Sequence, residues 1–417
     1  MSEIRDLSAL RSAIARHVEA SPAFDIHTHL YAEAFGDLLL RGPTELLTYH
    51  YLQAEANRVI VDLSPAAFVA LPKEQQARII WQKLFVERSP ISEATRGVVT
   101  AWRRLGISDP RSYEEAKARF AGLSAAEHID LVLRTANVSA VVMTNDPFHP
   151  TEQAVWRAGG ARDRRFLAAL RIDPLLLDWP ASAGRLQTQG YAAGAELDET
   201  TLDEARRFLR DWAQRMQALY IAASLPPSFM MPNAAEPYGR LLEQAVLPVC
   251  REMELPFAMM IGVKRGVAPE LAAAGDALGR CNLEAVGHLC RAWPDNKFLL
   301  TVLARENQHE AVVLARKFRN LHLFGCWWFN NNPSIMEEIT RERVEMLGLS
   351  VTLQHSDARI LDQLVYKWAH SRQIIAEALG EKYGYLISEG WYPTQEEIAR
   401  DVQMLLGGEF LRFAGRR

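Results

Sequence analysis

Two histidines near the start of the chain have the residue type and spacing that bind a metal ion. His27 and His29 stand two residues apart in the apolar segment 23–30, and residues i and i+2 of a strand point to the same face. Two imidazoles on one face can bind one metal through their ring nitrogens. Packed or exposed histidines with this spacing also occur without a metal, so the pair needs a further ligand.

Asp357, near the end of the chain, is the further ligand that we expect. It follows the apolar run 349–354, and a carboxylate at the end of the last strand of a closed barrel lies beside the first strand. The alternative is that Asp357 caps the next helix, and His355 is expected to pack or hydrogen-bond nearby. His27, His29 and Asp357 together predict one divalent metal ion, with zinc as the first expectation and manganese or another divalent ion as the alternative.

Eight short apolar runs predict the strands that position these ligands. Most of them lack polar alternation, which is typical of parallel strands covered on both faces. Each run is followed by a loop and then by helical periodicity, and strand and helix alternating eight times predict a (β/α)₈ TIM barrel. The runs span residues 23–27, 139–143, 166–172, 220–224, 256–263, 297–303, 321–326 and 349–354.

Helical insertions decorate this barrel, which we expect to form a single domain over residues 1–417. Residues 31–135, after the first strand, are rich in helix formers and are expected to cover the barrel mouth. A second helical insertion is expected at 175–218, after the third strand. A final helix is expected to begin at Thr394, where Glu397 completes a capping box.

The other strand ends carry cations and aromatic residues rather than further metal ligands. No histidine follows the fourth, fifth or sixth run, where two-metal barrel hydrolases place ligands, so a single metal with open positions is expected. Guanidinium groups bind carboxylates bidentately, so cations gathered at these ends favour an anionic ligand, although each alone could be a surface charge. Trp327 and Trp328, which precede three asparagines, are candidates for holding a sugar. The cations are Arg171, Lys264, Arg265, Arg305 and Arg359.

Composition narrows the class of protein. With 417 residues, 49% hydrophobic and 24% charged, the chain has an ordinary globular composition. A net charge of −4 without a basic stripe argues against nucleic acid as a partner. No signal peptide or uncharged run of about 20 residues is found, so we expect a cytoplasmic protein with no membrane partner. The four cysteines form no CxxC pair and are expected to be buried thiols.

The sequence resembles the uronate isomerases, a branch of the amidohydrolase superfamily, in their shorter bacterial form. The resemblance implies an amidohydrolase-type barrel that converts D-glucuronate to D-fructuronate and D-galacturonate to D-tagaturonate. We also expect a homo-oligomer. The matching segments extend over most of the chain in order and span residues 25–30, 47–51, 143–147, 169–174, 324–329 and 356–359.

The resemblance also implies roles for particular residues. His27, His29 and Asp357 match the metal ligands of the family, whereas longer members carry a histidine where this chain has Met260. The residues that match the substrate site are His50, Tyr51, Arg171 and Arg359.

The chemistry that we expect is proton transfer between adjacent carbons of an open-chain uronate. Asp357 would remove the C2 proton to give a cis-enediol, and Arg359 with Tyr51 would return a proton to C1, while Arg171 holds the acid end. His50 is expected to take part beside Tyr51. Three alternatives stay open: a hydride shift, a metal-dependent hydrolase or decarboxylase that uses metal-bound water, and a catalytically silent sensor of sugar acids.

Overall fold

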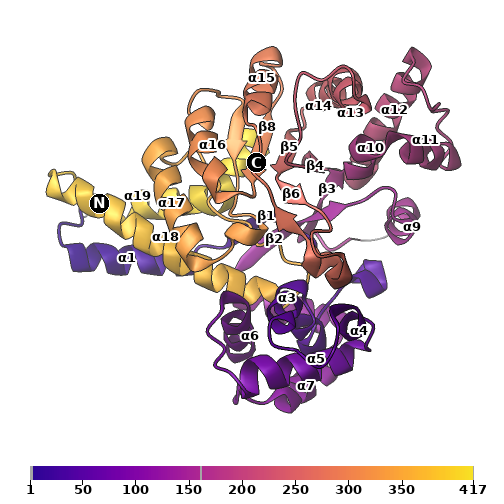
Figure 1. Ribbon diagram of the computed structural model, residues 1–417. Helices are drawn as coiled ribbons and strands as arrows, with labels where there is room; N and C mark the ends of the chain where they lie inside the picture. Colours follow the sequence, from indigo (N-terminus) through magenta and orange to yellow (C-terminus); the bar gives the residue numbers. More distant parts are fainter. Residues whose placement is uncertain (1–2, 160–161, 417) are drawn as a thin grey trace.

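The computed structural model describes residues 3–159 and 162–416 and has a curled parallel sheet at its centre (Figure 1). The sheet has seven strands in the order β1-β2-β3-β4-β5-β8-β9, and every neighbouring pair is parallel. Parallel neighbours need a long crossover connection, which helices supply. The strands are β1 (Ala23–Thr28), β2 (Val138–Asn145), β3 (Phe166–Arg171), β4 (Ile221–Leu225), β5 (Phe257–Ile261), β8 (Phe298–Val302) and β9 (Leu321–Leu323).

The segment 351–358 closes this sheet into a barrel. Thr352 forms a parallel bridge with Phe324, and its N–H donates to the carbonyl of Leu323 at 3.1 Å. At the other edge the N–H of Asp357 donates to the carbonyl of His27 at 3.1 Å. The segment therefore joins β9 to β1, and the predicted (β/α)₈ fold is confirmed.

Two of the predicted strands differ in extent from those in the structure. The run 349–354 forms a single bridge, at Thr352, rather than a regular strand. The run 256–263 is broken at Gly262, whose φ is 123°. The chain then turns outward into a short antiparallel hairpin, formed by β6 (Val263–Lys264) and β7 (Ala277–Leu278).

The core has an inner and an outer layer, because successive side chains of a strand point to opposite faces. On β5, Ala258 and Met260 belong to the inner cluster, whereas Phe257, Met259 and Ile261 belong to the outer cluster. The inner cluster is completed by residues of the other strands and by Phe410 of α20 (Glu409–Ala414), which packs against Phe24 and Tyr220. The barrel interior is therefore a packed core and not a channel.

A group of helices between β1 and β2 lies beneath the barrel in the view of Figure 1. Several begin with a serine cap; Ser124 and Glu127, for example, form a capping box at the start of α8. The group comprises η1 (Glu33–Leu38), α2 (Pro43–Leu47), α3 (His50–Asn57), α4 (Pro65–Val69), α5 (Lys73–Trp81), η2 (Gln82–Val86), α6 (Glu93–Arg104), α7 (Tyr113–Ala121) and α8 (Ala125–Ala136).

The remaining helices surround the sheet. Three of them, between β3 and β4, are α10 (Asp173–Leu177), α11 (Trp179–Thr188) and α12 (Glu199–Met216). The others up to α16 are α9 (Pro150–Ala158), α13 (Pro237–Leu241), η3 (Leu242–Val246), α14 (Leu247–Glu252), η4 (Pro269–Gly275), α15 (Glu284–Ala292), η5 (Arg305–Asn307) and α16 (Gln308–Ala315).

The longest helix, α18 (Gln363–Ser388), packs against α1 (Leu7–Ala20), α6, α8 and α17 (Pro333–Leu347). The predicted capping box of Thr394 and Glu397 begins α19 (Gln395–Gln403) and is confirmed. Within the described ranges, no helix is both long and apolar enough to cross a membrane. The last elements are η6 (Trp328–Asn330), η7 (Met404–Gly408) and α20 (Glu409–Ala414).

Candidate metal centre and substrate pocket

A bulge in β1 turns His27 toward the inside of the barrel. Phe24 and Ile26 already face the inner cluster, so strict alternation would send His27 outward. Between Asp25 and Thr28, however, β1 has one residue more than β2 in the strand register, and such bulges re-aim side chains. The ring of His27 accordingly lies against the interior ring of Phe324, at 6.4 Å between centroids.

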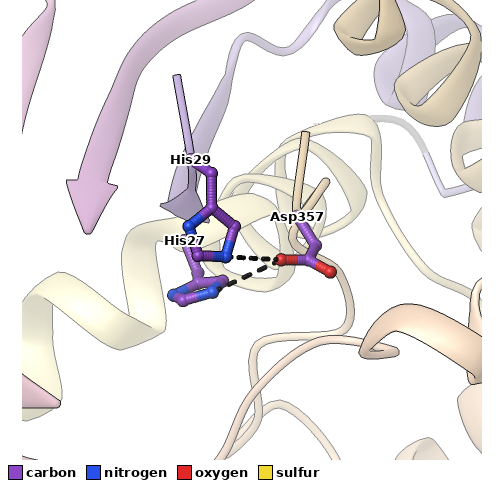
Figure 2. A group of neighbouring side chains, drawn as sticks. All are labelled: His27, His29 and Asp357. Atoms are coloured by element: carbon purple, nitrogen blue, oxygen red, sulfur yellow. Dashed lines mark ion pairs between the residues drawn. The ribbon is translucent and has the colours of Figure 1, made fainter. Parts of the chain in front are cut away.

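The bulge brings His27 and His29 together with Asp357 (Figure 2). The Nε2 atoms of His27 and His29 lie 3.5 Å and 3.3 Å from the same oxygen, Oδ1 of Asp357. Their three ligand atoms lie within 4.8 Å of one another. The expected cluster is thus present at the carboxyl ends of the strands, where barrel enzymes hold their reacting groups.

The chemistry of this cluster fits a divalent metal. Nε2 of His27 and Oδ1 of Asp357 are buried without a hydrogen-bond partner, and buried polar atoms of this kind normally have one. Burial and the Arg359 guanidinium lower the pKa of His29 to about 3, so its ring is neutral and can donate a lone pair. Oδ1 of Asp357 therefore faces the nitrogen lone pairs of two neutral imidazoles, and a divalent cation bound between them would remove this mutual repulsion.

Two hydroxyls set the proton on the far nitrogen of His27. Nδ1 lies 3.3 Å from the Tyr220 hydroxyl and 3.4 Å from that of Thr144. These hydroxyls donate their own protons to the carbonyls of Ile26 and Thr28, at 2.7 Å each. Both oxygens therefore accept from Nδ1–H, which leaves the Nε2 lone pair free for a metal. Sequence reasoning missed Tyr220 and Thr144, because each resembles an ordinary buried strand residue.

A cavity of about 250 Å³ contains several of the predicted substrate residues. His50 and Tyr51 enter it from the start of α3, and the His50 ring lies 5.5 Å from the ring of Trp328. His50 Nε2, the Tyr51 hydroxyl and Trp328 Nε1 are buried without hydrogen-bond partners, so this wall can bind a polar ligand. The lining residues are His50, Tyr51, Ala54, Glu93, Ala94, Ala274, Asp276, Trp328, Phe329, Asn331, Asn332 and Tyr366.

Arg359 lies near both this cavity and the cluster of His27, His29 and Asp357. Burial, followed by the charge of Arg359, lowers the pKa of His50 to about 3, and the same guanidinium acts on His29. Arg359 is therefore a cation close to both groups. Burial also raises the pKa of Tyr51 well above its ordinary value, which keeps the phenol protonated at neutral pH.

The other predicted substrate residues lie in different surroundings. Arg171, at the end of β3, donates from Nε to Oδ2 of Asp173 at 2.9 Å. Both tryptophans pack in the inner cluster; Trp328 also lines the cavity, whereas Trp327, which is 3% exposed, does not.

None of the five predicted cations lines the cavity that contains His50, and two of them, Lys264 and Arg305, lie elsewhere on the surface. Lys264 is exposed on the β6–β7 hairpin, which leaves the barrel at Gly262. Arg305 pairs with Glu338 of α17 at 2.8 Å and lines a separate surface hollow with residues of α16 and α17. Their positions after strands are as expected, but neither side chain lines the cavity that contains His50.

Comparison with known proteins finds a solved structure that matches nearly the whole chain. No family model and no curated protein matches the sequence. Among solved structures, a uronate isomerase from Bacillus halodurans is 50% identical, with 99% of this chain and 98% of that chain covered and a TM-score of 0.97.

More distant structures share the fold. A uronate isomerase from Thermotoga maritima is 16% identical, covers 95% of both chains and has a TM-score of 0.78. A glucuronate isomerase from Caulobacter crescentus is 14% identical, with 98% of this chain and 94% of that chain covered and a TM-score of 0.77. Because this chain is 50% identical to the Bacillus halodurans protein over nearly its full length, it belongs to the uronate isomerase family.

Proposed function

We propose that the protein isomerises uronates, converting D-glucuronate to D-fructuronate and D-galacturonate to D-tagaturonate by proton transfer through a cis-enediol. The observation that carries the proposal is the convergence of His27, His29 and Asp357 at the barrel mouth, in a chain of the uronate isomerase family. The wall of the adjoining cavity of about 250 Å³ carries buried polar atoms without hydrogen-bond partners, which can bind a polar ligand.

His27, His29 and Asp357 would hold one divalent ion, zinc by first choice with manganese or another divalent ion as the alternative. Three protein ligands are typical of a catalytic zinc site, where a position remains open for substrate. When bound, the ion supplies positive charge and Lewis acidity that favour an anionic, oxygen-rich substrate.

Asp357 is the group that we assign to removal of the C2 proton. A carboxylate beside the substrate can act as a general base. The C2 and C1 positions are adjacent, so a proton donor close to Asp357 can return a proton to C1.

Tyr51 and Arg359 are assigned to the carbonyl end. The Tyr51 hydroxyl is buried, has no hydrogen-bond partner and stays protonated, so it can donate to C1 or to the developing oxyanion. The charge of Arg359 stabilises an anionic enediolate. His50, neutral and with a free Nε2, can accept a hydrogen bond from a sugar hydroxyl, while Arg171 is proposed to bind the carboxylate of the substrate.

Proton transfer is preferred to hydride shift on the basis of the ligand count. Sugar isomerases that shift a hydride generally use two metals, and the part of the chain that the structure describes offers one cluster of potential ligands. A base and a proton donor both adjoin that cluster, as an enediol pathway requires.

The test is direct conversion of substrate. Purified, metal-loaded protein is incubated with D-glucuronate and with D-galacturonate, and the ketose products are followed by ¹³C NMR. D-glucose and D-galactose, which lack the carboxylate, are the matched controls and should be converted far more slowly. Failure to form a ketose from either uronate, with metal bound, would refute the proposal.

A further inference from the structure

Lys367 is a buried cation directly behind the site. It lies in the second turn of α18, is 2% exposed, and its Nζ donates to the carbonyl of Ser356 at 2.7 Å. Burial lowers the pKa of Lys367 to about 8, so it is an ammonium at pH 7. Among the described residues, no carboxylate lies within 4.0 Å of Nζ to form an ion pair.

The other half of the Ser356 peptide is held by Asp25. The N–H of Ser356 donates to Oδ1 of this carboxylate at 3.0 Å, and Nε1 of Trp368 donates to Oδ2 at 2.8 Å. The N–H and the carbonyl of Ser356 are thus both bound by buried charged side chains. The next residue is Asp357, whose φ of 50° lies in the left-handed region, where residues other than glycine are strained.

The same ammonium also lies over a second residue of the site. Nζ of Lys367 is 5.4 Å from the centre of the Tyr51 ring, a distance at which a cation and an aromatic face attract each other. One side chain therefore contacts both the peptide before the proposed base and the ring of the proposed proton donor.

A buried lysine at this position lowers the stability of the fold. Removing an ammonium from water costs several kcal/mol unless an opposite charge and further hydrogen bonds compensate, and Lys367 has one backbone acceptor and one ring. Methionine would fill a similar volume without that cost. This cost favours a role in the reaction.

We infer that Lys367 is a positioning residue, which holds Asp357 and Tyr51 in the relative placement that proton transfer between C2 and C1 requires. The inference rests on the proposed function, because it concerns the base and the donor of that reaction. Lys367 acts through Ser356 and through the Tyr51 ring and does not itself contact the substrate.

The experiment compares Lys367→Met and Lys367→Gln with Lys382→Met, a control on the same helix that removes a lysine paired with Glu345 and Glu381. We expect Lys367→Met to keep its metal content and thermal midpoint and to leave KM little changed, while kcat falls about 10- to 100-fold, as for residues that support a metal ligand. Lys367→Gln should lose less, because its amide can still donate to Ser356. The control should retain wild-type kcat.

A double-mutant cycle separates positioning from a general effect on stability. In a Tyr51→Phe background, which removes the proposed donor, Lys367→Met should reduce kcat by a smaller factor than in the wild type. Equal factors in the two backgrounds would overturn the inference.

Other outcomes are equally decisive. Wild-type kcat in Lys367→Met would overturn the inference, as would a loss of kcat that only follows a loss of metal. If Lys367→Met does not fold, wild-type kcat and KM in Lys367→Gln would overturn it. Absence of uronate isomerisation by the wild-type protein refutes the proposed function instead, so the two failures are distinguishable.

Discussion

At Gly325 a single added methyl group should lower the stability of the protein, because it would collide with His355, which packs against His27. Its φ is +64°, and a Cβ built there would lie 1.7 Å from Cδ2 and 2.4 Å from Nε2 of His355. Carbon atoms in contact are separated by about 3.5–4.0 Å, so the imidazole would have to move by roughly 2 Å. It has little room, because His355 is fully buried and packs against the rings of His27 and Phe324.

The expected loss of stability in Gly325→Ala has two parts. Overpacking a core costs about 1–3 kcal/mol, and alanine at a positive φ adds about 1 kcal/mol. Gly348→Ala is the matched control, because Gly348 has a φ of +60° but no atom within 4 Å of the added Cβ. The difference between the two variants measures the clash with His355.

The assay is urea denaturation followed by circular dichroism, with metal content measured on the folded protein. Gly325→Ala should unfold at a clearly lower urea concentration than Gly348→Ala. It should also bind metal more weakly, because displacement of His355 disturbs the ring of His27, whose centroid lies 5.1 Å away. Equal midpoints in the two variants, with full metal content in both, would refute the reasoning.

Three further predictions concern the site. His27→Ala and His29→Ala should each lose metal and activity together, since two of three ligands remain; full metal content by elemental analysis would remove the pair from the site. Arg171→Met should raise KM for uronates more than it lowers kcat, and unchanged kinetics would leave its pairing with Asp173 as its only role. Removal of metal with a chelator should abolish activity, and added zinc or manganese should restore it; activity that survives complete removal contradicts the metal assignment.

Local patterns in the sequence were sufficient to predict the barrel and the cluster of His27, His29 and Asp357, although not the bulge in β1 that turns His27 inward. Continuous apolar runs mark strands buried on both faces, and a His-x-His pair at the end of the first strand must meet the end of the last one when the barrel closes. Asp357 could be placed beside His27 and His29 for that reason alone. The capping box at Thr394 and Glu397 is a signal of the same local kind.

Contacts that depend on geometry across the barrel could not be predicted. Tyr220 and Thr144 resemble core residues in sequence, and only their distances from His27 reveal that they orient it. Lys367 resembles any lysine near the start of a helix, although it is buried beneath Ser356.

Position along a strand also does not determine where a long side chain turns. Arg305 follows β8 as expected but finds its partner, Glu338, on α17. Trp327 and Trp328 are adjacent and both pack in the inner cluster, but only Trp328, whose φ is 44°, also lines the cavity.

The proposed mechanism depends most on Asp357, which removes the proton from C2. Asp357→Asn keeps the size and one oxygen ligand but removes the basicity. The most direct measurement is therefore kcat of this variant on D-glucuronate, with metal content and substrate binding determined on the same sample. We expect appreciable metal, bound uronate and a kcat reduced about a thousandfold, toward the upper end of what loss of a general base costs. Near-normal turnover by Asp357→Asn, together with complete transfer of a C2 deuterium label to C1 in ordinary water, would contradict the proposed mechanism.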